Sequence, residues 1–193
     1  MPDLQFDPSK TVTFDLANGL VHLDGTPARV LVPGDALLAL ARAAGPDAAY
    51  AFGHSLGETM GQRVAHRLGA PASVNAATVS VVMDHLSGEF ALWGLGSLSL
   101  ERWGRSLVIV LDQSPLGPEG DAMIGALLKG AIATATGRGV HVLVLDRAAV
   151  RARYLVGGPS GVERMRAWLA EGVPWGDALV RLHAVSEPVR GDA

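Results

Sequence analysis

The string Gly53-His-Ser-Leu-Gly57 is the part of the sequence whose residue types and spacing could do chemistry. A G-x-S-x-G pattern resembles the nucleophile elbow of serine hydrolases and, with Glu58, the active-site string of acyltransferases that act on acyl carriers. Such chemistry also needs a histidine and an acid, and His85, His141 and His183 are unplaced candidates for the histidine. One alternative for this protein is therefore a serine hydrolase or acyltransferase-like enzyme.

The residues before Ser55 favour a helix over an elbow. An elbow holds its serine on a strained turn that follows a strand. Here residues 45–52 begin with Gly-Pro-Asp, which is typical of a helix start, and are rich in Ala and poor in β-branched residues. We therefore predict a long helix over residues 48–68 and no catalytic residue.

Gly53, Gly57 and Gly61 recur every four residues along this predicted helix. Their spacing makes a smooth stripe on one helix face, along which another backbone can approach closely. Each interior glycine costs up to about 1 kcal/mol of helix propensity, so the stripe indicates a packing contact. We predict that the stripe is a homodimer interface, with Arg63 or Arg67 near its rim.

Metal-binding and redox chemistry have little support in the sequence. His54 and Glu58 lie one helical turn apart, and Asp84 and His85 could approach from a second helix, but an H-E-x-x-H pattern is absent. The chain has no cysteine, which excludes disulfides, thiolate metal sites and a cysteine nucleophile. We expect no metal and no cofactor.

The composition limits the partners of the protein. A net charge of -3 without any basic tract argues against binding to nucleic acid. The longest apolar run, residues 122–135, contains Lys129 and is too short to span a membrane, and the first residues do not form a secretory signal, so we place the protein in the cytoplasm. Hydrophobic residues make up 49% of the chain. This apolar surplus suggests a ligand pocket or a subunit interface.

The centre of the chain predicts an α+β fold, a mostly antiparallel sheet covered by a helical layer. Short β-branched runs bounded by Gly, Pro and Asp predict the strands, and apolar residues at helical spacing predict the helices. The expected strands are residues 95–100, 105–112, 141–146 and 152–156, with helices over 75–90 and 121–137. Asp121 is expected to be the N-cap of the last of these helices.

The two ends of the chain have their own signals. Asn18-Gly19 between alternating runs predicts an N-terminal β-hairpin of residues 11–16 and 20–23. A third strand or extended segment over 28–32 and a helix over 36–44, capped by Asp35, are expected to follow. Near the C-terminus, Ser160 and Glu163 match a capping box at the start of a helix that ends at Ala170, although Gly157 to Gly161 could instead cradle a phosphate. A last helix over 175–182 is expected. We predict an N-terminal unit (1–46), a main domain (47–185) and a disordered tail (186–193).

Residues 47–172 resemble the 4-vinyl reductase domain family, which is related to the small subunits of TRAPP vesicle-tethering complexes and to nitric-oxide-signalling sensor domains. The resemblance depends on the glycine-spaced helix at 52–61, the strands near 94–98 and 108–115, and the helix with repeated small residues at 123–130. It implies a helical layer on an antiparallel sheet, dimerisation through helices and an apolar cavity between the layers. The cysteines that bind metal in some members are replaced here by Arg151, Arg153 and Tyr154.

The expected ligand site lies between the helix pair and the sheet. We predict that a hydrophobic small molecule contacts Met60, Met83, Leu86 and Trp93, because flexible Met side chains adapt to irregular ligands. The leading interpretation is therefore a non-enzymatic homodimeric domain that binds such a molecule or acts as a protein-protein assembly or regulatory module.

Overall fold

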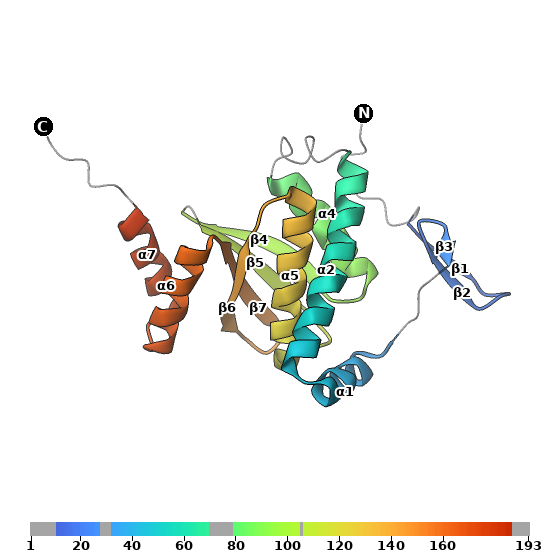
Figure 1. Ribbon diagram of the computed structural model, residues 1–193, viewed down its shortest axis with the longest axis horizontal. Helices are drawn as coiled ribbons and strands as arrows, with labels where there is room; N and C mark the ends of the chain where they lie inside the picture. Colours follow the sequence, from blue (N-terminus) through green and yellow to red (C-terminus); the bar gives the residue numbers. More distant parts are fainter. Residues whose placement is uncertain (1–10, 28–31, 70–78, 105, 187–193) are drawn as a thin grey trace, which may run out of the picture.

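The computed structural model describes residues 11–27, 32–69, 79–104 and 106–186 (Figure 1). Its main sheet has four antiparallel strands in the order β4-β5-β7-β6. The strands are β4 Ser97–Trp103, β5 Ser106–Asp112, β6 His141–Arg147 and β7 Arg151–Gly157. The helices are α1 Gly34–Ala44, α2 Pro46–Leu68, α4 Val79–Leu92, α5 Asp121–Thr136, α6 Pro159–Ala170 and α7 Trp175–Ser186, with a short 3-10 turn, η2, at Pro118–Gly120. The fold is α+β, as predicted.

The larger hydrophobic core lies between one face of the sheet and helices α2, α4 and α5. Helix α5 is buried on nearly all sides, because the sheet covers one side of it and α2 covers the opposite side (Figure 1). Its Ile124 and Leu128 pack in this core with Ile109 of β5 and Phe90 of α4. The helical layer is therefore two helices deep over α5.

The other face of the sheet packs against α6 and α7. Val108 and Leu155 point to this side and form a second core with Met165 and Leu179. Strand β5 is thus covered on both faces, which is why its sequence is an almost continuous apolar run with no alternation.

Arg153 occupies the part of this outer face that is polar. Its guanidinium donates to Glu101 and to Asp146 and lies 5.3 Å from the centre of the Trp175 ring. The hydrogen bonds from Arg153 lower the pKa of Glu101 below its ordinary value. Arg153 therefore has a structural partner on each side.

The predicted N-terminal hairpin is confirmed. Strand β1 (Val12–Asp15) pairs with β2 (Leu20–Leu23), and Gly19 has the positive φ of 66° that this turn requires. A short third strand, β3 (Thr26–Pro27), pairs with β2, whereas most of the third strand predicted over 28–32 lies outside the described residues. The small sheet stands at one side of the body (Figure 1), and Asp24 reaches back from it to Arg63 of α2.

The helix caps differ from the prediction. Gly120 is the N-cap of α5, and Asp121 lies in the first turn, where it pairs with Arg147 and accepts a hydrogen bond of 3.0 Å from the Tyr154 hydroxyl. Burial raises the pKa of Tyr154, so this hydroxyl stays protonated and continues to donate. Asp121 is used for a tertiary contact and is therefore not free to cap the helix.

The prediction of a capping box at Ser160 and Glu163 is wrong as well. Helix α6 begins at Pro159 with Gly158 as its N-cap, and no side chain caps it, so Ser160 is already inside the helix. Proline suits this first position because its missing N–H would have no partner there. At α1, Pro33 is the N-cap, and Asp35 accepts the Ala36 N–H within the first turn.

Two predicted segments extend partly beyond the described residues. The helix predicted over 75–90 is α4, which begins at Val79 and continues to Leu92, so residues 75–78 lie outside. The last helix runs to Ser186, and the remaining residues of the predicted tail, 187–193, also lie outside.

Candidate ligand pocket

The glycine stripe of α2 packs against α5 of the same chain. A methyl group added at Gly61 would lie 2.5 Å from the Ala131 carbonyl oxygen, and methyl groups at Gly53 and Gly57 would collide with the carbonyls of Met123 and Leu127. Gly130 on α5 has the same relation to the His54 carbonyl of α2. The two backbones therefore touch through glycine on both helices.

This packing corrects the predicted role of Gly53, Gly57 and Gly61. All three glycines are buried within one chain, so the stripe is not a free surface for a second subunit. The spacing correctly indicated a close backbone approach. Its partner, however, is α5 of the same chain.

Ser55 lies in the middle of α2 and is exposed to solvent. No strand leads into it, so the strand-turn-helix geometry of a nucleophile elbow is absent at this position. Within the described residues, its hydroxyl forms no hydrogen bond with a histidine or a carboxylate. Its carbonyl oxygen accepts the Thr59 hydroxyl at 3.2 Å, an ordinary contact one turn along a helix.

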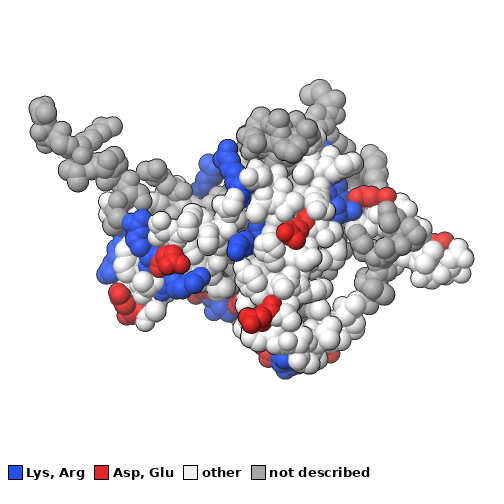
Figure 2. Space-filling model, viewed as in Figure 1, with Lys and Arg blue, Asp and Glu red and all other residues white. Residues whose placement is uncertain are grey.

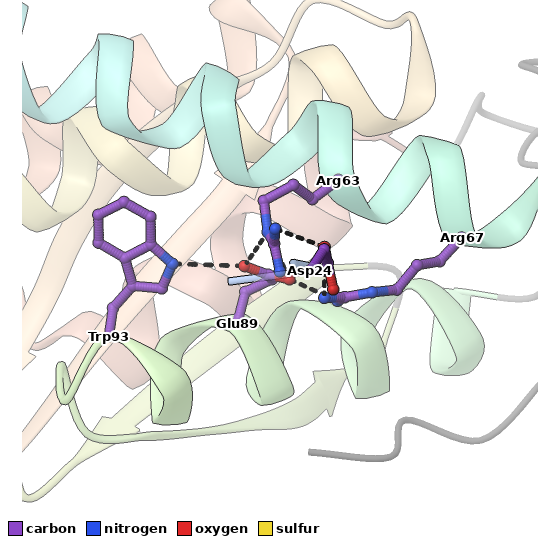
Figure 3. Close-up of polar contacts among 5 residues, drawn as sticks. All are labelled: Asp24, Arg63, Arg67, Glu89 and Trp93. Carbon is purple, nitrogen blue, oxygen red and sulfur yellow. Dashed lines mark hydrogen bonds and ion pairs between the residues drawn. The ribbon is translucent and has the colours of Figure 1, made fainter. Parts of the chain in front are cut away.

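Glu89 of α4 is fully buried, with an exposed fraction of 0%, and lies between two arginines of α2. Arg63 Nε donates to both of its oxygens at 3.1 and 2.9 Å, and Arg67 Nη1 pairs with one of them (Figure 3). The Trp93 Nε1 donates to the same carboxylate at 3.4 Å, and Asp24 of the hairpin accepts from Arg63 at 2.6 Å. Two positive and two negative groups thus balance in this Glu89 cluster.

The Glu89 cluster fixes α4 to α2. A buried carboxylate is tolerated only where charged donors replace the water that it loses, and the two arginines supply these donors. Arg63 and Arg67 therefore do not lie at the rim of an interface on the glycine stripe, as predicted from the sequence. They hold the two helices together on the side of α4 that faces α2.

A pocket of about 250 Å³ lies on the other side of α4, between this helix, α5 and the sheet. Its walls come from four different parts of the chain. The lining residues are Val79, Val82, Met83 and Leu86 of α4, Ile132 and Thr136 of α5, Arg138 and Val140 after α5, and Leu107 and Val156 of the sheet. Val79 is 45% exposed, whereas Leu86 is completely buried, so the pocket leads from the surface into the core.

The lining is almost entirely apolar. The Thr136 hydroxyl donates to the Ile132 carbonyl at 2.7 Å and accepts the Arg138 backbone N–H at 3.3 Å, so its single donor and one of its two acceptor lone pairs are already used. No acidic side chain lines the pocket among the described residues. Such a lining suits an apolar molecule. The molecule must also be small, because the pocket volume is just below the range of about 300 to 1,000 Å³ that is typical of ligand sites.

The structure brings together two of the four predicted ligand residues. Met83 and Leu86 line the pocket, whereas Met60 is completely buried in the core and Trp93 contacts Glu89. Ile132 and Thr136 were not predicted as lining residues. Helical spacing identifies the inner face of α4, but it does not show which residues of α5 lie opposite.

Two kinds of feature are missing from the described parts of the chain. No helix there is both long and apolar enough to cross a membrane. No group of three or more His, Asp and Glu side chains is arranged there to hold a metal ion. His54 and Glu58 form only a pair, with Nδ1 and Oε1 3.6 Å apart.

Comparison with known proteins supports the fold and leaves the family open. No family model matches the chain, and no curated protein matches it. Among solved structures, the chain is similar to the phenol-responsive sensory domain of the transcription activator PoxR, in a crystal structure with phenol. The TM-score is 0.56 and the sequence identity is 14%, and the match covers 93% of this chain and 94% of that chain. The resemblance to the 4-vinyl reductase family therefore remains a prediction, whereas the chain shares its fold with a sensory domain.

Proposed function

We propose that this protein is a non-enzymatic regulatory domain that binds a small, mostly apolar molecule in the pocket between α4, α5 and the sheet. The observation that carries the proposal is the pocket itself, an apolar hollow of about 250 Å³ that reaches from Val79 at the surface to the buried Leu86. An apolar wall of this kind faces water when the pocket is empty, so a bound apolar molecule would stabilise the fold by removing this surface from water.

The similarity in fold is consistent with this proposal. The match to the phenol-responsive sensory domain of PoxR covers nearly the whole of this chain. A domain of this kind changes its behaviour when a ligand favours one of its conformations. In the present protein, a ligand against Val82 and Met83 would press on α4, which the Glu89 cluster connects to α2 and to the N-terminal hairpin.

The pocket belongs to the part of the chain that we propose as the main domain, residues 47–185. Each described residue that lines it lies in this range. Residues 1–46 would form a separate N-terminal unit, whose described part consists of the hairpin and α1. In this division, the described part of the N-terminal unit contributes Asp24 to the Glu89 cluster and no residue to the walls of the pocket.

A blocking substitution at the mouth of the pocket tests the proposal. We expect Val79→Trp to fill the entrance without disturbing the fold, because Val79 is 45% exposed. Native mass spectrometry should show bound small molecules on the purified wild type, or a panel of alkyl and aromatic compounds should raise its melting temperature. Val79→Trp should lose either effect. The matched control is Val180→Trp, at a position on α7 that is 65% exposed and does not line the pocket.

A wild type that carries no ligand and responds to no compound of the panel would contradict this function. So would a Val79→Trp variant that binds as well as the wild type, because the ligand would then occupy another site.

We further propose that the protein is a homodimer that uses the outer face of α1 and the start of α2. Helix α1 has no buried residue although it is largely apolar, and Leu40 is 66% exposed. Phe52 of α2 is 47% exposed and, with Leu37, Leu40 and four alanines, lines a hollow that has only apolar side chains. In Figure 2 the surface over α2 and α5 is also largely uncharged, whereas charged side chains gather over α6 and α7. An exposed apolar face of this kind suits a two-fold dimer, in which the same patch of both subunits is buried.

Sedimentation velocity tests the dimer. We expect the wild type to sediment as a dimer at micromolar concentration and Leu40→Glu to sediment as a folded monomer, because a charge at the centre of an apolar interface loses its hydration. Val180→Glu places the same charge on the exposed face of α7 and should leave the dimer intact. A monomeric wild type, or a dimeric Leu40→Glu variant, would refute this interface.

A further inference from the structure

We propose that the molecule bound in this pocket is an amphipathic anion, with an apolar body between α4 and α5 and one carboxylate at Arg138. This inference rests on the proposed function, and it adds the chemical class of the ligand. Its basis is the distribution of charge and of unused hydrogen-bonding groups around the pocket.

Arg138 is the only lining residue that carries a charge among the described residues. The Thr136 hydroxyl cannot serve as a donor to a ligand, because it already donates to the Ile132 carbonyl at 2.7 Å. All other lining side chains are apolar. A ligand with a single polar group would therefore place that group at Arg138, where it meets both a donor and solvent.

The Arg138 guanidinium has no carboxylate partner among the described residues. Arg63, Arg67, Arg147 and Arg153 each pair with at least one acidic side chain. By contrast, the only hydrogen bond of Arg138 within the described residues is donated by its backbone N–H to the Thr136 hydroxyl at 3.3 Å. That contact and the left-handed Gly137, with φ 66°, fix the backbone from which the side chain extends. The five donors of the guanidinium remain free for a carboxylate, which accepts two of them at once.

The helix end beside Arg138 does not cancel its charge. The C-terminus of α5 carries roughly half a negative charge, which by itself would repel an anion. The guanidinium carries a full positive charge on a flexible side chain and can lie between this helix end and the ligand. An anion is therefore favoured at the mouth of the pocket. A cation would be repelled by the Arg138 guanidinium, and none of the described lining residues is acidic and could offset this repulsion.

The expected preference is modest, because Arg138 is exposed. An exposed ion pair contributes at most about a fivefold change in affinity, and salt weakens it. Selectivity for the anion should therefore decrease as the salt concentration rises, while binding of the apolar body should not.

Three eight-carbon probes of the same shape, octanoate, octanol and octylamine, separate the head group from the body. Calorimetry on the full chain at low salt would measure their affinities for the wild type, for Arg138→Gln and for Arg166→Gln. Arg166 is an exposed arginine on α6 and does not line the pocket, so it controls for the change in net charge. We expect the ratio of octanoate affinity to octanol affinity to fall about fivefold in Arg138→Gln and to stay unchanged in Arg166→Gln. Octylamine should be the weakest probe for the wild type.

The possible results distinguish the two proposals. If octanol binds and Arg138→Gln leaves the ratio unchanged, the anionic head group is refuted and the apolar pocket stands. A ratio that falls equally in both variants also refutes it, because the effect then comes from net charge alone. If the wild type binds none of the three probes but responds to other compounds of the alkyl and aromatic panel, this inference fails and the proposed function stands. A wild type that carries no ligand and responds to no compound of the panel refutes both. Since the measured quantity is a ratio within each variant, a general loss of pocket integrity does not imitate the expected result.

Discussion

Helix α5 lies next to two other helices, α2 and α4, and the two contacts differ in how closely the helices pack. Toward α2, its backbone lies against the glycines at 53, 57 and 61 with no room for a methyl group. Toward α4, a hollow of about 250 Å³ separates the two helices. The first contact is close because glycines leave no side chains between the two backbones, whereas side chains of both helices, such as Val82 and Ile132, line the hollow.

The difference indicates which parts of the molecule are rigid. Close packing between α2 and α5 fixes their relative position, since neither helix can move closer or rotate without a clash. Helix α4 is connected to α2 through Glu89 and the arginines, and to strand β4 through the Ser87 hydroxyl, which donates to the Leu98 carbonyl at 3.1 Å. Another side of α4 borders the pocket. A ligand would therefore act on α4 more easily than on α2, and substitutions can test this comparison.

Glu89→Ala should have the largest effect on stability. Removal of the carboxylate leaves Arg63 and Arg67 with buried positive charge and no partner for it on α4, and loss of one member of a buried ion pair typically costs about 3 to 5 kcal/mol. Denaturant unfolding would measure the loss. Glu163→Ala, at an exposed position on α6, should stay within about 0.5 kcal/mol of the wild type. Similar small losses for both variants would mean that the Glu89 cluster does not hold α4 in place.

Gly57→Ala should have the next largest effect. The added methyl group would collide with the Leu127 carbonyl and approach the Ala131 nitrogen at 2.9 Å, and overpacking of this kind costs about 1 to 3 kcal/mol. Gly57→Leu should be worse, because a larger side chain must separate the helices.

Gly125→Ala is the matched control for this contact. The glycine is also in a helix, but a methyl group there would meet its nearest neighbours, Tyr154 and Val142, only at 4.0 Å. This substitution should be neutral or should stabilise the protein by up to about 1 kcal/mol through helix propensity. If Gly57→Ala and Gly125→Ala changed the unfolding free energy alike, α2 and α5 would not be in backbone contact.

Local patterns in the sequence predicted most of this fold, because they arise within single elements. The apolar run before Asp112 and the Asn18-Gly19 turn each specify one element without reference to the rest of the chain. The predicted strands and helices accordingly match the structure to within a few residues where it describes them.

The sequence could not specify which elements meet. The spacing of Gly57 and its neighbours showed a smooth face but not what covers it, although Gly130 on α5 was a matching signal. Glu89 offered another signal that was missed, since it is a carboxylate on the same helix face as Leu86 and Phe90, which are apolar. Its partners lie 22 and 26 residues earlier in the chain, beyond any local pattern. Pocket residues such as Ile132 also depend on tertiary packing.

Asp24→Asn should have a small effect on global stability. Asp24 contacts the arginines of the Glu89 cluster, but its side chain is 49% exposed, and exposed ion pairs contribute about 0.2 to 1 kcal/mol. Hydrogen exchange should nevertheless become faster in β2, because this contact connects the hairpin to the body. If Asp24→Asn lowered the unfolding free energy as much as Glu89→Ala, the hairpin would belong to the same rigid unit as α2 and α5.

Ser55→Ala should have the smallest effect, and it decides between a binding domain and a serine enzyme. Ser55 is exposed in the middle of α2, on a helix whose buried face carries Gly53 and Gly57, so loss of its hydroxyl should change the unfolding free energy by less than about 0.5 kcal/mol. A catalytic serine needs a base within hydrogen-bond reach, and no histidine bonds to this hydroxyl within the described residues. We therefore expect that a fluorophosphonate probe does not label the wild type, with a known serine hydrolase as the positive control. Stoichiometric labelling that Ser55→Ala abolishes would show instead that α2 opens to present an activated nucleophile, and the rigid contact between α2 and α5 would then be wrong as well.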